Sequence, residues 1–346
     1  MKRIVMLFFM ILLTTIPVSA IELEAPVVPS SGRDLMPSEH ESFTEGLLEV
    51  LTDALGYLQP DLKEASGICF CTIAAVMIVA VLQSFHGMSG NVTDLAGSIL
   101  VATLLLRSTN SLIHLGMQTV GEISEYGKLL LPVMTTAMAA QGGVTAASAL
   151  YAGTAFFDAV LTSLISKILT PMVYLFLSLA AACSAVGEEM LIKVKDAVKW
   201  AMTWTLKIIL YVFTGYISIT GVVSGTTDAA ALKAAKLTIS GVVPVVGGIL
   251  SDASEAVLVS AGTVKNAMGV YGLLAVVSVW LGPFIRIGAH YLMIKLTAGV
   301  CGIIGSKRLS GLIRDFAGAM GFVLAMTGAV CLMLMVSTVC YMKGMV

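Results

Sequence analysis

Charged residues are scarce in this sequence, at 12% of 346 residues, while 58% of the residues are hydrophobic. Soluble domains carry about 25% charged and about 45–50% apolar residues. The mean hydropathy of +0.96 therefore excludes a water-soluble fold and predicts an integral membrane protein. The net charge of −1 gives no sign of nucleic-acid binding.

Motifs for metal, redox and nucleotide chemistry are also missing. The six cysteines form no C-x-x-C pair and all lie within apolar stretches, as small buried side chains do. No Walker A loop, G-x-S-x-G elbow or H-E-x-x-H motif is present. We therefore expect a protein that is not an enzyme, with no catalytic residue, no metal site and no cofactor.

The N-terminus has the pattern of a secretory signal. Lys2 and Arg3 precede an apolar run from Ile4 to Ile16, and small residues follow at Val18-Ser19-Ala20. This pattern predicts a signal peptide over residues 1–20. An uncleaved anchor helix is the alternative, and either one places residue 21 onward outside the cytoplasm.

Residues 21–66 are acidic, with ten acidic residues against two basic ones, a net charge of −8. Residues 41–58 predict an amphipathic helix, because apolar and acidic residues each recur every fourth position on opposite faces. The apolar set is Phe43, Leu47, Leu51 and Leu55, and the acidic set is Glu41, Glu45, Glu49 and Asp53. We expect the apolar face to pack on the chain's own membrane domain.

Residues 67–346 carry a net charge of +5 and predict an all-α, multi-spanning membrane domain. Apolar stretches recur along this region, and several are shorter than the about 20 residues that one crossing needs. All crossings are expected to be helical, because lipid offers no partner to unpaired backbone groups. We predict a bundle of six to eight transmembrane helices. The apolar stretches are 67–85, 95–116, 129–150, 155–186, 208–225, 238–250, 257–282, 284–304 and 317–341.

Four prolines suggest an internal duplication. Pro132 and Pro171 are 39 residues apart, and so are Pro244 and Pro283. This spacing predicts two related units over residues 129–225 and 241–341. Small and polar residues surround Pro132 and Pro244, which fits either re-entrant segments or ordinary helices kinked by proline and packed through glycine.

Ionisable residues within apolar stretches are the candidates for function, because a charge at bilayer depth is costly. Asp252 and Glu255 share one helix face, and Arg286 and His290 share another. These pairs could meet across helices or line a polar conduit. The candidate polar and hinge residues are Pro244, Gly247, Gly248, Asp252, Glu255, Arg286 and His290.

Two stretches carry a family resemblance. Gly225-Thr-Thr-Asp228 and the run P-V-V-G-G-x-x-S-D-A at 244–253 resemble the stage III sporulation protein AE family. The signal, acidic segment and membrane region also follow that family's layout, although the acidic segment is shorter than usual.

The resemblance implies a subunit of the channel-like complex that links the mother cell and the forespore during endospore formation. Such a subunit lies in the mother-cell membrane around the forespore and is required for late forespore development. Its implied partners are the other stage III A proteins and stage II sporulation protein Q. The alternatives are an independent secondary transporter or permease, and a membrane scaffold that anchors ring-forming partners.

The charges predict the topology of the chain. Lys and Arg in short loops collect on the cytoplasmic side, so Lys193–Lys207 and Lys307–Arg314 should lie in the cytoplasm and residues 21–66 outside. Fusions of a reporter that is active only outside the cytoplasm should be inactive at both basic clusters and active within residues 21–66. Activity at either basic cluster would contradict the assignment.

Overall fold

Long helices dominate the chain, as the apolar composition requires. The computed structural model describes residues 25–37, 43–56, 58–84, 90–141, 143–242, 247–304 and 307–343, and of residues 90–91 and 220–265 only the backbone. The predicted signal, residues 1–20, lies outside the described residues. The elements are α2 (Ser30–Arg33), α3 (Phe43–Gly56), α4 (Leu58–Ser84), α5 (Gly90–Ala140), α6 (Val144–Leu164), the π-helix η1 (Ile165–Leu169), α7 (Thr170–Val186), α8 (Glu189–Val242), α9 (Gly247–Ile304) and α10 (Lys307–Lys343).

Within the described residues, six helical segments are long and apolar enough to cross a membrane. This number confirms the all-α, multi-spanning fold and the predicted six to eight crossings. The segments are Phe43–Ser84, Val92–Ala140, Val144–Val186, Glu189–Ile219, Asn266–Ile304 and Lys307–Lys343. The 58 residues of α9 reach about 87 Å at 1.5 Å per residue, so α9 extends well beyond a hydrocarbon core of about 30 Å.

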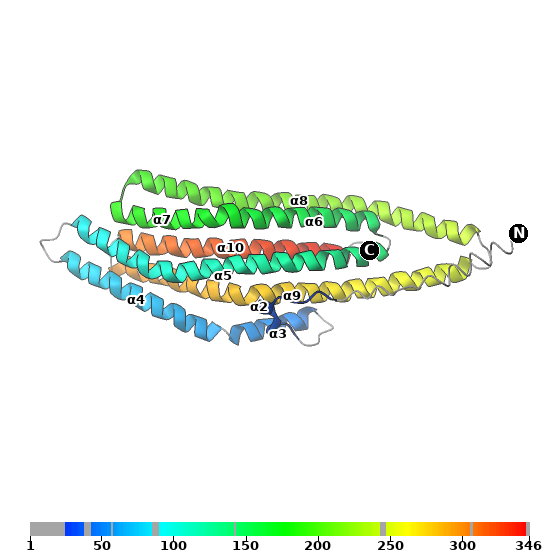
Figure 1. The fold of residues 1–346 in the computed structure, drawn as a ribbon, viewed down its shortest axis with the longest axis horizontal. Helices are drawn as coiled ribbons and strands as arrows, with labels where there is room; N and C mark the ends of the chain where they lie inside the picture. Colours follow the sequence, from blue (N-terminus) through cyan, green and yellow to red (C-terminus); the bar gives the residue numbers. More distant parts are fainter. Residues whose placement is uncertain are drawn as a thin grey trace.

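Helix α10 forms the centre of the bundle (Figure 1). It contacts α5, α6, α7, α8 and α9, and Phe316, Met320 and Tyr341 are fully buried along its length. Near its C-terminal end, the Tyr341 hydroxyl lies 3.1 Å from the Thr135 hydroxyl of α5. The axis of the bundle is therefore filled by a helix.

Three of the inter-helix connections lie at one end of the bundle (Figure 1). They join α4 to α5, α7 to α8, and α9 to α10. Gly187 makes the second turn with a φ of +78°, a conformation that favours glycine, and its N–H donates to the Cys183 carbonyl at 2.9 Å. Both predicted basic clusters follow such a turn, so the fold brings them to the same end, as a shared cytoplasmic location requires.

Ion pairs and a hydroxyl contact join the helices at this basic end. The Lys195 ammonium of α8 lies 2.5 Å from the Asp315 carboxylate of α10. Arg308 of α10 lies 3.5 Å from the Asp94 carboxylate of α5. The hydroxyls of Ser98 and Ser184 are 2.8 Å apart between α5 and α7.

The first expected interruption is not re-entrant. Pro132 lies inside α5, which continues to Ala140, and α6 begins at Val144. The apolar stretch 129–150 therefore belongs to two helices, α5 and α6. A proline removes only one backbone donor, and neighbouring helices can compensate for it at membrane depth.

The other prolines behave differently. Pro171 follows the π-helix η1, where the Thr170 hydroxyl donates to the Ile165 carbonyl at 2.9 Å. Pro283 lies inside α9, and Pro244 falls outside the described residues. Each proposed unit thus contains a long helical segment with an internal proline, then a turn, then a helix that begins at the basic end.

Helix α3 packs on α9 with a different face from the one predicted. Gly46, Val50 and Ala54 are buried, and Gly46 lies close against Leu274 of α9. Leu47 of the predicted apolar face packs beside them, whereas Leu51 and Leu55 of that face are exposed, by 37% and 55%. Small side chains allow the closer approach of two helices, and they decided which face turned inward.

The contact between α6 and α8 predicts a sensitive position at Gly153. A β-carbon there would overlap the ring of Tyr216, whose hydroxyl donates to the Ala149 carbonyl at 2.7 Å. We expect Gly153→Ala to cost about 1–3 kcal/mol through overpacking, measured as a lower thermal unfolding midpoint in detergent.

Gly215 of α8 is the matched control. A β-carbon at Gly215 meets nothing within 4 Å, and alanine favours a helix by about 0.8–1 kcal/mol over glycine. Gly215→Ala should therefore leave the unfolding midpoint unchanged or raise it. Equal midpoints for Gly153→Ala and the unaltered chain would contradict the assigned packing.

Candidate functional site

The N-terminal segment lies against α9 through a small apolar cluster. Leu35 follows α2, Val50 and Ala54 belong to α3, and Val277 and Leu281 belong to α9. The Ser278 hydroxyl donates to the Leu274 carbonyl at 2.8 Å and lies 3.3 Å from the Leu35 carbonyl. The acidic segment is therefore packed on the membrane domain over α2 and α3.

Arg286 joins the start of α4 to α9 by two ion pairs. Its Nη2 lies 3.1 Å from Glu64 Oε2, and its Nε lies 3.6 Å from Asp61 Oδ1. Asp61 and Glu64 are three residues apart, so they share a face of α4. The Arg286 side chain is 43% exposed, and partly exposed pairs of this kind contribute about 0.2–1 kcal/mol each.

His290 lies one turn further along α9 and is 1% exposed. Its Nδ1 is 2.9 Å from the Arg286 carbonyl oxygen. A carbonyl oxygen only accepts, so Nδ1 donates its hydrogen in this bond. The Nε2 atom is buried and has no hydrogen-bond partner among the described residues.

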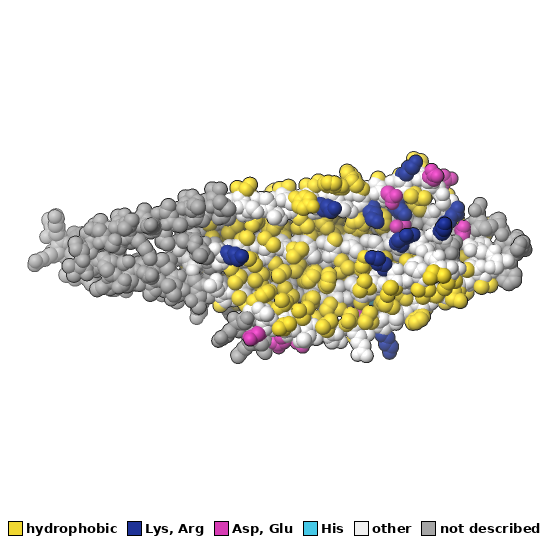
Figure 2. Space-filling model, turned by 180° about the vertical axis from the view of Figure 1, so that it is seen from behind, with side chains coloured by type: hydrophobic (Ala, Val, Ile, Leu, Met, Phe, Trp, Pro, Cys, Tyr) yellow, Lys and Arg dark blue, Asp and Glu magenta, His cyan; other side chains and the backbone are white. Residues whose placement is uncertain are grey.

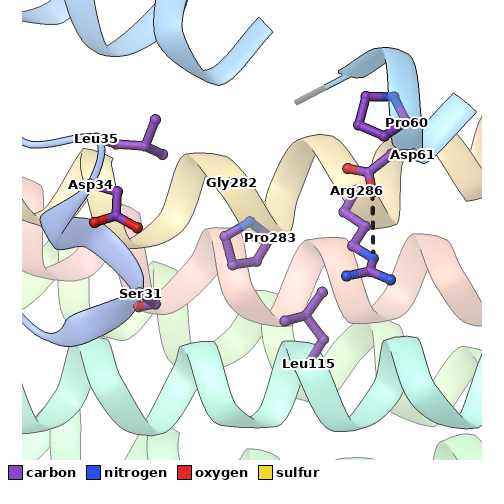
Figure 3. Close-up of a pocket in the computed structure, with 9 residues that line it drawn as sticks. All are labelled: Ser31, Asp34, Leu35, Pro60, Asp61, Leu115, Gly282, Pro283 and Arg286. Atoms are coloured by element: carbon purple, nitrogen blue, oxygen red, sulfur yellow. Dashed lines mark ion pairs between the residues drawn. The ribbon is translucent and has the colours of Figure 1, made fainter. Parts of the chain in front are cut away.

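A cavity of about 310 Å³ lies beside these ion pairs. In Figure 3, Ser31 and Asp34 of the N-terminal segment lie toward one end, and Asp61 and Arg286 toward the other. Pro283 of α9 lies between them. The cavity therefore has polar ends and an apolar middle, and its size suits water or a small polar group. The lining residues are Ser31, Asp34, Leu35, Pro60, Asp61, Leu115, Gly282, Pro283 and Arg286.

Helix α5 contacts the segment at the Ser31 end. The Ser31 hydroxyl donates to the Glu122 carboxylate, which also accepts from the Gln118 amide at 2.8 Å. Together with Arg286, these bonds hold the N-terminal segment at both α5 and α9. The arrangement is a polar latch, defined by Ser31, Asp61, Glu64, Glu122 and Arg286.

The structure separates the two predicted ionisable pairs. Arg286 and His290 lie in the site, whereas Asp252 and Glu255 lie near the start of the same helix, α9. Asp252 and Arg286 are thus about 51 Å apart along the helix axis, so the two pairs do not meet within one chain. The side chains of Gly247, Gly248, Asp252 and Glu255, and the whole of Pro244, lie outside the described residues.

Sequence reasoning missed the acidic partners of Arg286. Asp61 and Glu64 were assigned to the acidic outer segment, which was set apart from the membrane domain. Their spacing was the available signal, since two carboxylates three residues apart at the start of an apolar helix favour a cation on a neighbouring helix.

A second buried carboxylate lies away from this site. Asp158 of α6 is 6% exposed and accepts a hydrogen bond from the Ser124 hydroxyl of α5 at 2.7 Å. The buried Thr154 hydroxyl, one turn earlier on α6, has no partner among the described residues. Asp158 thus joins α5 and α6 as Arg286 joins α4 and α9.

Comparison with known proteins identifies relatives of the chain. Residues 36–344 match the family described as Stage III sporulation protein AE. The Stage III sporulation protein AE of Bacillus subtilis (strain 168) is 22% identical over 271 residues, which is 78% of this chain. The match spans 66% of the length of that relative. No solved structure matches. The family match covers most of the membrane domain described above, and the chain therefore belongs to the stage III sporulation protein AE family.

Proposed function

We propose that the chain is a non-enzymatic membrane subunit of the channel-like complex that links the mother cell and the forespore during endospore formation. Family membership and six apolar helices support a membrane subunit in sporulation. The proposed location is the mother-cell membrane around the forespore, with the acidic segment outside the cytoplasm and the basic turns inside. The proposed role is in late forespore development.

The position of α10 at the centre of the bundle is the observation that supports a structural role. Helix α10 contacts five other helices, and its buried side chains form one continuous core with theirs. A solute carrier instead places its binding site between repeats near the middle of the membrane. Any passage formed by this subunit would therefore lie between chains, with partners of the same complex.

The acidic segment is the proposed surface for those partners. The latch at Arg286 fixes the segment on the bundle, while Leu48 and Leu55 of α3 are exposed by 59% and 55%. An intact latch would keep this exposed surface of α3 in one orientation. Other stage III A proteins and stage II sporulation protein Q are the proposed partners.

Reversing the central charge of the latch tests the proposal. We expect Arg286→Glu to reduce heat-resistant spores, because it removes two ion pairs and adds repulsion from Asp61 and Glu64. Adding Asp61→Lys and Glu64→Lys should restore sporulation in part by re-forming the pairs with opposite sign. Lys295→Gln is the control, since among the described residues its ammonium contacts the Tyr291 hydroxyl and ring of the same helix.

Purification of tagged chain from sporulating cells provides the second measurement. The other stage III A proteins should co-purify with the unaltered chain and with the control variant. At equal membrane abundance, smaller amounts of them should co-purify with the Arg286→Glu variant. A chain that is essential for sporulation yet purifies without them would overturn complex membership and favour an independent transporter. In that case Asp252→Asn should abolish transport, as expected for an essential carboxylate at membrane depth.

A further inference from the structure

One face of α8 carries a regular row of basic and aromatic side chains. Lys193, Trp200, Trp204, Lys207 and Tyr211 follow each other at intervals of seven, four, three and four residues, which places them on one helix face. We refer to these five residues as the α8 stripe. Trp200, Trp204 and Tyr211 are exposed by 63%, 46% and 68%, and both lysines are also exposed.

The rest of the bundle lies on the opposite side of α8. The buried residues of this part of the helix are Met202, Leu206, Ile209, Phe213 and Ile217. Each is about half a turn away from the stripe at 100° per residue. They pack into the common core, so the α8 stripe faces away from the other described helices.

The exposed surface of α8 changes from charged to apolar at the two tryptophans. On the side of the Gly187 turn, the exposed residues include Glu189, Lys193, Asp196 and Lys199. From Trp200 to Ile219 the only charged residue is Lys207, and Ile208, Val212 and Ile219 are exposed by 53%, 54% and 68%. Figure 2 shows most of the basic side chains gathered toward this end of the molecule and apolar side chains over much of the remaining described surface.

Tryptophan at a boundary between charged and apolar surface is typical of the membrane–water interface, because its ring is amphipathic. The two indole rings also contact each other, with centroids 6.1 Å apart. Helix side chains lean toward the helix N-terminus, so the Lys207 ammonium extends back toward Trp204 and the charged end. Lysine side chains reach the interface in this way.

Both lysines of the stripe are available to a ligand. Neither Lys193 nor Lys207 forms an ion pair with a described residue, whereas the neighbouring Lys195 is paired with Asp315. From Trp200 to Ile219 no acidic residue lies on α8 to compete for a cation. The charge pattern is therefore complementary to an anion at the level of the tryptophans.

We propose that the middle of the α8 stripe, Trp200, Trp204 and Lys207, binds the headgroups of anionic phospholipids. The Lys207 ammonium contacts the phosphates, the two indole rings lie among the headgroups, and the acyl chains cover Ile208, Val212 and Ile219. The proposal places the lipid–water boundary on the α8 side about 20–25 Å from the Gly187 turn. It is independent of the proposed function, because it rests on α8 alone.

Fluorescence quenching by brominated lipids tests the proposal on the full chain. The sequence holds three tryptophans, so Trp280→Phe leaves only Trp200 and Trp204 to report. The chain is reconstituted in phosphatidylcholine vesicles with a small fraction of brominated phosphatidylglycerol or brominated phosphatidylcholine. One lysine at about 1 kcal/mol predicts a preference of roughly fivefold for the anionic lipid.

The position of the bromine and the salt concentration give independent readouts. Bromine near the headgroup should quench more than bromine at the chain end, because the indoles lie at the interface. A higher salt concentration should reduce the preference for the anionic lipid, because it screens the Lys207 ammonium. Equal quenching by both lipids in the unaltered stripe would overturn the proposal and favour a protein partner for this face.

Matched variants assign the preference to the stripe. Lys207→Gln should abolish the preference. Lys193→Gln, about 21 Å away along α8, should change it little. Lys295→Gln is a second control, because that lysine lies on α9 beside Tyr291, and it should leave the preference unchanged. A preference that persists in the Lys207→Gln variant would overturn the proposal.

Discussion

Every peptide group inside a bilayer has to find its hydrogen-bond partner within the protein, and the architecture follows from this constraint. The chain meets it with helices of 51, 54 and 58 residues in α5, α8 and α9. Pro132 and Pro283 are tolerated inside such helices, since each removes one donor only. At Pro171 a π-helix precedes the proline, and the Thr170 hydroxyl bonds to a carbonyl of that turn.

Polar side chains at the helix contacts also have their partners within the protein. Arg286 is surrounded by acidic partners on α4, and Asp158 has the Ser124 hydroxyl of α5. Each contact links two helices and gives a charged side chain a partner within the protein. The latch at Arg286 also gives the acidic segment a fixed place on the bundle.

The fold class and the number of crossings could be predicted from the sequence, because composition and span length decide both. The turn at Gly187 was also readable, since a glycine preceded a charged helix. The helix ends near Gln141 could not be predicted, because apolar residues continue past Ala140 and Pro132 suggested an earlier break. The inward face of α3 depended on how closely Gly46 approaches Leu274, and the partners of Arg286 lie 222 and 225 residues away. Such contacts are set by tertiary packing, which local periodicity does not contain.

The central position of α10 has a consequence for biosynthesis. The five helices that surround it precede it in the sequence, so the ribosome delivers the core helix after its neighbours have entered the membrane. Until then, those neighbours expose to lipid or to the insertion machinery the surfaces that later hold Phe316 and Met320. Assembly of the subunit is thus coupled to completion of its last described helix, and a chain interrupted before that point carries an open groove that membrane proteases can recognise.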